Sequence, residues 1–182
     1  MLTWIPDFRR ALNAHFGPKP RVGALATVDA AMRPRVRSVV CRRVDDDGTV
    51  WIASDTRSQK SRHVRANATV ELLFWLASLR EQYRLAGTAH VLHERAEREG
   101  VWREMSGESR ALFFWPDPDE PAAPAGGAEV VRTVGPEVPP PDTFELLVIH
   151  PREVELLDVN PQPHRRVRWE AGREWAAREV NP

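Results

Sequence analysis

The chain has 182 residues, of which 26 are basic and 26 acidic, so its formal net charge is zero. A neutral chain has no overall field to draw it to nucleic acid or to an anionic membrane, so we expect neither partner. Hydrophobic residues make up 42% of the chain and charged residues 29%, as in an ordinary soluble protein. This length suits a single domain over residues 1–182.

The apolar runs, the N-terminal sequence and the cysteine content indicate the expected location of the protein and the kinds of site that it can hold. No apolar run approaches the roughly 20 residues of a membrane span, and the N-terminus lacks the charged start and apolar core of a signal peptide. The single cysteine, Cys41, has no partner for an internal disulfide or a thiolate metal site. We therefore expect a cytoplasmic protein that holds no metal.

The N-terminal third predicts a short helix followed by antiparallel strands. Phe8, Leu12 and Phe16 recur every fourth residue, which is typical of one helical face, and Gly17-Pro18 ends the pattern. Residues 22–28 form a run that is apolar on both faces, as expected for a strand buried in a barrel. A turn over 29–34 leads to a second strand over 35–44.

That second strand places its cations on different faces. Strict alternation puts the valines at 36, 40 and 44 on one face together with Arg42, and Arg37 on the opposite face unless a bulge intervenes. Asp45 to Gly48 then forms a hairpin turn, because Asp and Gly tolerate a positive φ angle. A further apolar strand follows over 49–54.

A basic helix is expected over residues 58–67. Ser58 is the first choice for its N-cap, with Thr56 or Asp55 as alternatives. Lys60 lies in the first turn, where a cation is unfavourable for the helix dipole unless an anion is bound there too. A lysine that is simply solvated is the alternative interpretation.

Strands are predicted over 69–75 and 80–91, and helices over 94–104 and 108–115. On the longer strand Gln82 and Arg84 belong to the more polar face, and the Gln82 amide is either a surface group or able to read the edge of a heteroaromatic ring. Residues 116–141 are rich in Pro, Ala and Gly and predict a surface loop or a partly disordered segment.

The C-terminal part predicts more strands. They cover 144–149 and 154–159, followed by a hairpin of 167–169 and 175–180 about Ala171-Gly172. The chain is therefore expected to be mainly β, an antiparallel barrel with flanking helices outside it or across its mouth.

Five motifs, in matching order and spacing, resemble those of the pyridoxamine 5′-phosphate oxidase family. The motifs are Arg37–Arg42 (similar to Arg-x-Val-x-x-Lys/Arg), Ser54 after the next strand, Ser58-Gln59-Lys60, Asn67–Phe74 (similar to Asn-Pro-x-x-x-Leu-Leu-Phe) and Leu79–Gly87 (similar to Leu-Glu-Arg-Gln-x-x-x-x-Gly). The segment Ser109–Pro116, Trp102 and the ending Val180-Asn181-Pro182 resemble a subgroup of oxidase-like FMN-binding proteins. The resemblance runs from Trp4 to the C-terminus.

The resemblance implies an FMN-binding split β-barrel that forms a homodimer with its flavin site at the subunit interface. It implies that Arg37 and Lys60 hold the flavin phosphate, two cations around a dianion. The other residues that it implies in cofactor binding are Ser38, Val39, Val40, Arg42, Ser54, Ser58, Gln59, Gln82 and Arg165. Arg165 would come from the partner subunit, with its neighbour Arg166 as the alternative if the turn is shifted by one residue.

The substrate side departs from the family. Its members resemble one another in an Arg-x-His-x-Arg run near the C-terminus, where this chain has Pro161 and Pro163. Neither proline side chain can bind an anion or donate a hydrogen bond to a pyridine ring. Arg42 stands where the family has a lysine on the substrate side. The resemblance thus implies an FMN-dependent oxidoreductase acting on a small molecule, and no side chain is nominated as catalytic.

Other functions stay open as alternatives. They are a genuine pyridoxamine or pyridoxine 5′-phosphate oxidase with an altered pocket, and a non-catalytic flavin or nucleotide binder. A nucleic-acid surface over Arg165–Trp169 is disfavoured by the zero net charge, because such a run is more often a solvated edge strand. His90 and His93 lie three residues apart on a strand and so face opposite sides, which disfavours a shared metal.

Overall fold

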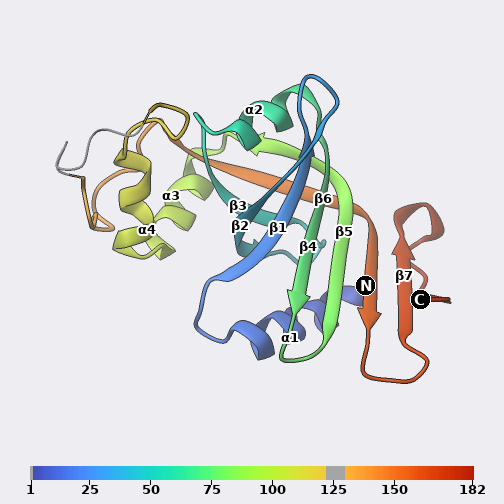
Figure 1. Ribbon diagram of the computed structural model, residues 1–182. Coiled ribbons are helices and arrows are strands. Elements are labelled where there is room, and N and C mark those ends of the chain that lie inside the picture. The colour runs from blue at the N-terminus through green and yellow to red at the C-terminus, as the bar shows by residue number, and fades with distance from the viewer. Residues whose placement is uncertain (1, 122–129) are drawn as a thin grey trace.

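The computed structural model describes residues 2–121 and 130–182 (Figure 1). Its helices are α1 (Trp4–Phe16), α2 (Gln59–Ala66), α3 (Arg95–Glu104) and α4 (Gly107–Ala111), with 3-10 turns η1 (Leu112–Phe114) and η2 (Ala171–Arg173). Its strands are β1 (Arg21–Val28), β2 (Pro34–Val44), β3 (Val50–Asp55), β4 (Thr69–Leu76), β5 (Glu81–Leu92), β6 (Phe144–Asp158), β7 (Arg165–Glu170) and β8 (Arg178–Val180).

The strands form one antiparallel sheet that closes into a barrel. Their order is β3-β2-β1-β4-β5-β6-β7-β8, and β3 also pairs with β6, which closes the first six strands on themselves. The strands β7 and β8 continue from β6 outside this closed barrel. The predicted antiparallel barrel with flanking helices is therefore confirmed.

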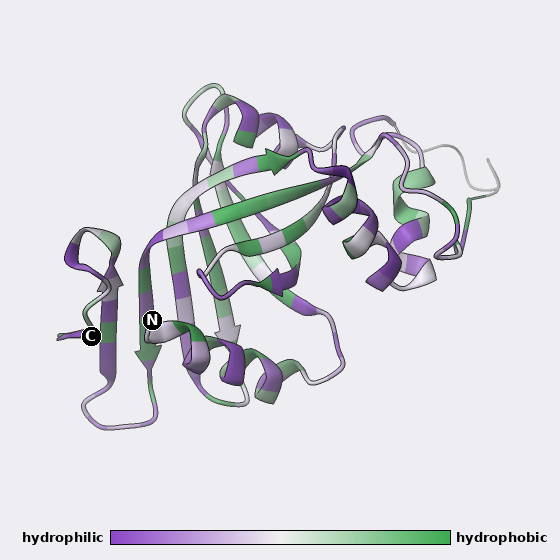
Figure 2. Ribbon diagram, turned by 180° about the vertical axis from the view of Figure 1, so that it is seen from behind, coloured by the Kyte–Doolittle hydropathy of each residue, from purple (hydrophilic) through white to green (hydrophobic). Residues whose placement is uncertain are grey.

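The barrel interior is filled by buried hydrophobic side chains of the strands. Hydrophobic residues recur as green bands along the strand ribbons in Figure 2. One end is plugged by α1, whose Trp4, Phe8 and Leu12 are completely buried. The Phe8 ring lies 5.5 Å from the Phe74 ring and 5.0 Å from the Tyr83 ring. The helix starts four residues before the predicted Phe8, since the proline at position 6 lies in the first turn, where its missing N–H costs no helical hydrogen bond.

A second apolar cluster lies outside the barrel, where α3 and α4 pack on β3 and β6. Trp102, Phe113 and Phe144 form its aromatic centre, with ring centroids 4.9–5.8 Å apart. The buried guanidinium of Arg110 ties α4 to the loop after it, because its Nε donates to the Val134 carbonyl at 2.8 Å. These contacts fix α4 beside the barrel wall. The helix predicted over 108–115 is in fact two short pieces, α4 and η1.

The two C-terminal strands predicted over 144–149 and 154–159 are one continuous strand, β6. It passes through Pro151 at a register shift, where Ala86 pairs with Glu153 and Gly87 with Pro151. A proline fits here because a bulge already interrupts the ladder. Gly87 fits opposite because a Cβ atom at this position would lie 2.1 Å from the His150 carbonyl oxygen.

Two expectations for the first strands need correction. Strand β1 alternates between buried and partly exposed residues, and Val22 is 44% exposed, so the strand is not buried on both faces. In β2 the register shifts between Cys41 and Arg43, so Val44 turns into the core and leaves the face of Arg42. An extra residue at a bulge reverses the alternation that follows it.

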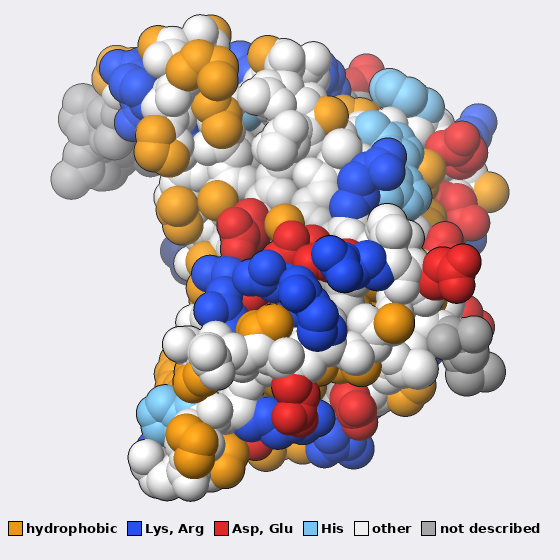
Figure 3. Space-filling model, turned by 90° about the vertical axis from the view of Figure 1, so that its right-hand side faces the viewer, with side chains coloured by type: hydrophobic (Ala, Val, Ile, Leu, Met, Phe, Trp, Pro, Cys, Tyr) orange, Lys and Arg blue, Asp and Glu red, His pale blue; other side chains and the backbone are white. Residues whose placement is uncertain are grey.

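Strand β7 is not the edge strand that was expected, since β8 pairs along it. Its arginines are paired with carboxylates: Arg165 with Glu179, and Arg166 and Arg168 both with the buried Glu155. Figure 3 shows Lys/Arg and Asp/Glu side chains interspersed over this side of the molecule. The positive charge of the Arg165–Trp169 run is thus locally neutralised.

The loop predicted over 116–141 holds no helix or strand in its described parts, 116–121 and 130–141. The possible disorder falls partly on residues 122–129, which lie outside the described residues. Among the helices of the described chain, none has the length and apolar character needed to cross a membrane.

We predict that Gly87→Ala lowers the free energy of unfolding by about 1–3 kcal/mol, because the added methyl group has no space against β6. Urea denaturation followed by circular dichroism measures the change. The matched control is Gly100→Ala in α3, where a Cβ atom meets nothing within 4 Å. This control should be neutral or stabilising by up to about 1 kcal/mol. Equal stability of Gly87→Ala and wild type would contradict the close approach of β5 and β6.

Candidate functional site

A cavity of about 370 Å³ lies on the outer side of the barrel, between β2 and β3 on one side and α2 and α4 on the other. Its lining comprises Ser38, Val39, Val40, Arg42, Ala53, Ser54, Asp55, Arg57, Ser58, Lys60, Ser109, Leu112, Phe113, Trp115, Pro116 and Pro118. The volume is within the range of about 300–1,000 Å³ that is usual for small-molecule sites.

The barrel wall of the cavity comes from alternate residues of β2. Val39 and Cys41 point into the core, so Ser38, Val40 and Arg42 point outward toward the cavity. Ser54 adds a buried hydroxyl near the end of β3. Seven predicted cofactor residues therefore line one cavity. They are Ser38, Val39, Val40, Arg42, Ser54, Ser58 and Lys60.

The start of α2 supplies the cationic end of the cavity. Ser58 is the N-cap as predicted, and its Oγ accepts a hydrogen bond from the Ser61 amide at 3.4 Å. Lys60 is half-buried, and its Nζ donates to the Ser58 Oγ at 3.2 Å. Burial lowers the pKa of Lys60, and the positive charge of Arg37 lowers it further, while Asp55 and Glu145 oppose the shift. The site therefore holds a desolvated ammonium group at a helix N-terminus, which is suited to an anion.

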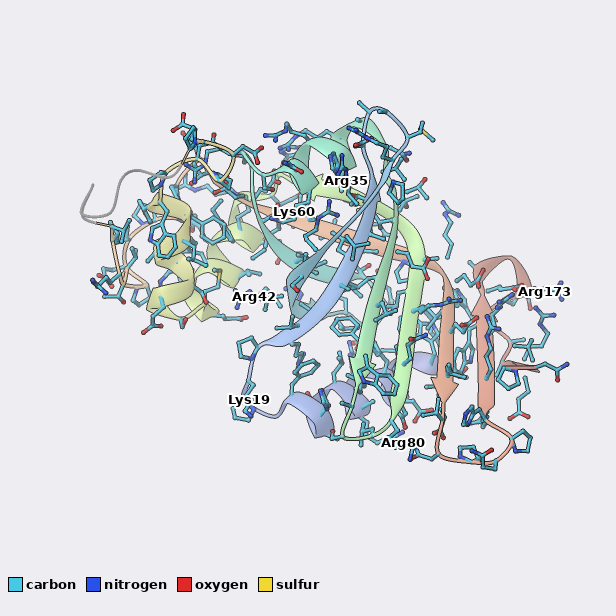
Figure 4. The ribbon with its side chains drawn as sticks, in the orientation of Figure 1. Lys19, Arg35, Arg42, Lys60, Arg80 and Arg173 are labelled. Atoms are coloured by element: carbon cyan, nitrogen blue, oxygen red, sulfur yellow. The ribbon has the colours of Figure 1, made fainter. Side chains whose placement is uncertain are left out.

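Arg42 is a second cation with unused hydrogen-bonding capacity. Its Nε is buried and has no hydrogen-bond partner among the described residues, and burial lowers its pKa. In Figure 4, Lys60 from α2 and Arg42 from β2 lie on the side of the barrel that faces α3 and α4. Arg42, Val40 and Ser109 also line a second cavity of about 370 Å³, toward Lys19 and Arg21. Arg42 thus stands at the boundary between two adjoining cavities.

The opposite wall is apolar and was not predicted from the sequence. Leu112, Phe113 and Trp115 line it, and Leu112 and Trp115 are exposed to 49% and 40%. Exposed aromatic and aliphatic side chains around a concave surface are typical of a binding site. A possible signal was the segment Ser109–Pro116, where three aromatic residues follow a short helix directly before a proline.

Arg37 lies outside the cavity lining. It is on the opposite face of β2 from Arg42, as strict alternation predicts. Its Nη1 donates to the Leu25 carbonyl at 3.0 Å and to the Thr27 Oγ1 at 2.7 Å, and its Nη2 lies 3.4 Å from the His63 Nδ1. The guanidinium therefore lies beneath α2, close enough to Lys60 for its charge to affect the Lys60 pKa.

Three further predicted residues also lie elsewhere. Gln59 is exposed on α2 and donates to the Asp119 carboxylate at 3.2 Å. Gln82 is on the outer face of β5, paired with Trp75 of β4 and Leu157 of β6. Arg165 starts β7 and lines a separate surface cavity with Pro161 and Pro163. Within one chain, the structure does not bring these three side chains to Lys60.

The comparisons with known proteins agree with this architecture. The family profile described as pyridoxamine 5′-phosphate oxidase matches residues 11–158. The chain belongs to the pyridoxamine 5′-phosphate oxidase family. A pyridoxine/pyridoxamine 5′-phosphate oxidase of Anaeromyxobacter dehalogenans is 30% identical over 98% of this chain and 94% of its own length. The corresponding enzyme of Thermosynechococcus vestitus is 31% identical, over 60% of this chain, and the matched part is only 55% of that enzyme.

Two solved structures share the fold over nearly the whole length of the chain. A pyridoxamine 5′-phosphate oxidase-related, FMN-binding protein of Nostoc punctiforme superposes with a TM-score of 0.84 and 25% identity, covering 100% of this chain and 99% of that protein. PhzG of Burkholderia lata, solved with tetrahydrophenazine-1-carboxylic acid, has a TM-score of 0.78 at 22% identity and covers 97% of this chain and 89% of PhzG. The second likeness concerns the fold alone.

We predict that Lys60→Met raises the unfolding midpoint of the ligand-free protein in urea at pH 7. The lowered pKa means that the folded state disfavours the charged ammonium, so below the folded pKa wild type carries the full penalty. As the pH rises from the lowered folded pKa to the unfolded pKa, about 10.4, the ammonium deprotonates and the difference should shrink to nothing. The chain's only other lysine, the exposed Lys19, supplies the control Lys19→Met, which should leave the midpoint unchanged. A lower midpoint for Lys60→Met would refute the desolvated site.

Proposed function

We propose that this chain binds FMN in the cavity between β2, β3, α2 and α4 and acts as an FMN-dependent oxidoreductase. The observation that carries the proposal is the half-buried Lys60 at the N-terminus of α2, in a cavity whose far wall is apolar. A phosphorylated aromatic molecule needs both: a cationic end for the phosphate and an apolar slot for the ring. The family membership and the FMN-binding relative from Nostoc punctiforme support the choice of flavin.

The phosphate is assigned to the start of α2. Lys60 supplies the ammonium, Ser58 a hydroxyl, and the first turn of the helix its free N–H groups and positive dipole. Arg37 lies behind the helix and adds positive potential, as its effect on the Lys60 pKa indicates. Because both cations are partly withdrawn from water, a bound dianion relieves their mutual repulsion.

The ring system is assigned to the wall made by β2 and the end of β3. The outward residues of β2, with the Ser54 hydroxyl, border one side, and Leu112 and Phe113 border the other. When bound, the flavin would supply the redox chemistry, and the protein would orient it and exclude water. No side chain of the chain is assigned an acid or base role.

Two predicted cofactor residues outside the cavity, Gln82 and Arg165, are assigned to a second copy of the chain. Gln82 and Arg165 lie outside the cavity of their own chain, yet both are presented on outward faces of the C-terminal half of the sheet. In a homodimer with the flavin at the subunit interface, these side chains would complete the site of the partner. This arrangement accounts for their separation from Lys60 within one chain.

The substrate is assigned to the second cavity. It adjoins the first at Arg42 and Ser109, so a molecule held there would lie next to the ring. The Arg42 guanidinium, with its unpartnered Nε, would attract an acidic group of that molecule. The near full-length likeness to the Anaeromyxobacter dehalogenans enzyme favours pyridoxamine or pyridoxine 5′-phosphate as the first candidates. Because the prolines at positions 161 and 163 cannot serve as polar substrate ligands, a different small molecule is the second candidate.

We predict that Lys60→Ala combined with Arg37→Ala weakens FMN binding by at least about 100-fold. Loss of the Lys60 charge-assisted hydrogen bond costs about 1.5–3 kcal/mol, loss of Arg37 removes positive potential at the phosphate, and the two effects multiply in the dissociation constant. Quenching of FMN fluorescence on binding measures the affinity. Arg10→Ala is the control, because Arg10 is exposed on α1 and pairs only with Asp7. An unchanged affinity in the double variant would sink the phosphate assignment.

We also predict that two defective variants restore binding when mixed. One variant carries Lys60→Ala and Arg37→Ala, and the other Gln82→Ala and Arg165→Ala. After unfolding and refolding together in equal amounts, random pairing gives half heterodimers, each with one intact site, so about a quarter of all sites should bind FMN with wild-type affinity. Binding no better than that of the separate variants would contradict a site shared between subunits.

A further inference from the structure

One segment lines the outer side of the cavity and is held by contacts that the proposed FMN site does not use. We name residues 115–119 the strap. Trp115, Pro116 and Pro118 of the strap line the cavity, opposite the β2 wall. The strap leaves η1 at Trp115, whose indole N–H donates to the Val131 carbonyl at 2.7 Å. Its prolines restrict the backbone, so the strap behaves as a stiff segment with few points of attachment.

Both ends of the strap are attached to the segment around the start of α2, from Arg57 to Arg62. At the first end, Arg57 donates from Nη1 to the Trp115 carbonyl at 2.9 Å. Arg57 is itself fixed by the carboxylate of Asp55, which accepts hydrogen bonds from its Nε and Nη2. At the other end, Asp119 accepts a hydrogen bond from Gln59 and forms an ion pair with Arg62.

The start of α2 therefore contacts both the cavity and the strap, each through different residues. Ser58 and Lys60 line the cavity. Gln59 and Arg62 point to the strap, and both hydrogen bonds to Asp119 lower the pKa of its carboxyl group. The family resemblance implied that Gln59 is a cofactor residue, and the structure gives it a different contact. The helix that offers the anion site is thus the one that holds the closing segment.

We infer that Asp119, through Arg62 and Gln59, fastens the strap over the cofactor cavity and determines how slowly the cofactor leaves. The inference rests on the proposed FMN site. A cofactor bound between β2 and the strap should leave more readily when the strap lifts, and lifting requires the Asp119 contacts to break. The Asp119 contacts should therefore affect the rate at which FMN dissociates, whereas the phosphate contacts of Lys60 determine the intrinsic affinity.

The test compares FMN release from wild type and from Asp119→Ala. Protein loaded with FMN is diluted, and the recovery of free flavin fluorescence gives the dissociation rate. An exposed ion pair and one hydrogen bond are lost, so release should accelerate about three- to tenfold, with little change in the association rate. Salt should accelerate release more from wild type than from Asp119→Ala, because in wild type it screens the exposed Asp119–Arg62 pair as well as the phosphate contacts.

Two further variants distinguish the loss of the Asp119–Arg62 contact from a general change of charge. Glu120→Ala removes the neighbouring exposed carboxylate, which makes no ion pair with the described residues, and should release FMN at the wild-type rate. Asp119→Arg combined with Arg62→Asp reverses the pair and should bring the rate back toward wild type. Equal release rates for wild type and Asp119→Ala would overturn the inference.

A second measurement tests the attachment of the strap independently of FMN binding. Amide hydrogen exchange of residues 115–120 in flavin-free protein should be faster in Asp119→Ala than in wild type, whereas exchange in β5 should not differ. If wild type fails to retain FMN, the proposed function fails and the role in cofactor release fails with it. Unchanged exchange of the strap would refute the fastening itself, whatever the outcome with FMN.

Discussion

The pairing of β3 with β6 is the constraint on which the rest of the structure depends. It closes six strands into a barrel by joining Val50–Asp55 to Phe144–Ile149, two segments far apart in the sequence. Closure pairs Asp55 at the end of β3 with Phe144 of β6, and so anchors to the barrel the chain segment that continues directly into Ser58 and Lys60. It also places Phe144 where Trp102 and Phe113 can pack on it, which fixes α4 as the outer wall of the cavity. The site is a consequence of how the barrel closes.

The partly buried cations of the molecule occur in two different surroundings. On the C-terminal strands, three arginines surround the buried Glu155 and their charges are matched by carboxylates. Around the cavity, Lys60 and the Arg42 Nε lie partly buried, and no carboxylate of residues 2–121 and 130–182 is bonded to them. Burying cations in this way costs stability, and folded proteins retain such groups mainly at functional sites. This contrast separates arginines that hold the fold from cations that are available to a ligand.

Much of this arrangement could be predicted from the sequence, where local patterns decide it. Turn residues, strand alternation and the Ser58 cap predicted the element order and the start of α2, and the motifs predicted seven residues of the cavity. Features that depend on distant contacts could not be predicted. The passage of β6 through Pro151 requires the bulge opposite Gly87, and the turn of Val44 into the core requires the register shift of β2. The apolar wall at Leu112 and Trp115 depends on how the outer helices dock, and the place of Gln82 on the outer face of β5 depends on its pairing with β4 and β6.

The most direct test of the account is the visible absorbance spectrum of the purified protein after incubation with FMN and desalting. The account predicts the absorbance bands of bound flavin at a stoichiometry of about one flavin per chain, because each chain has one such cavity among its described residues. A colourless protein after desalting would contradict it. The barrel would then be a member of the family that has kept the architecture and lost this ligand.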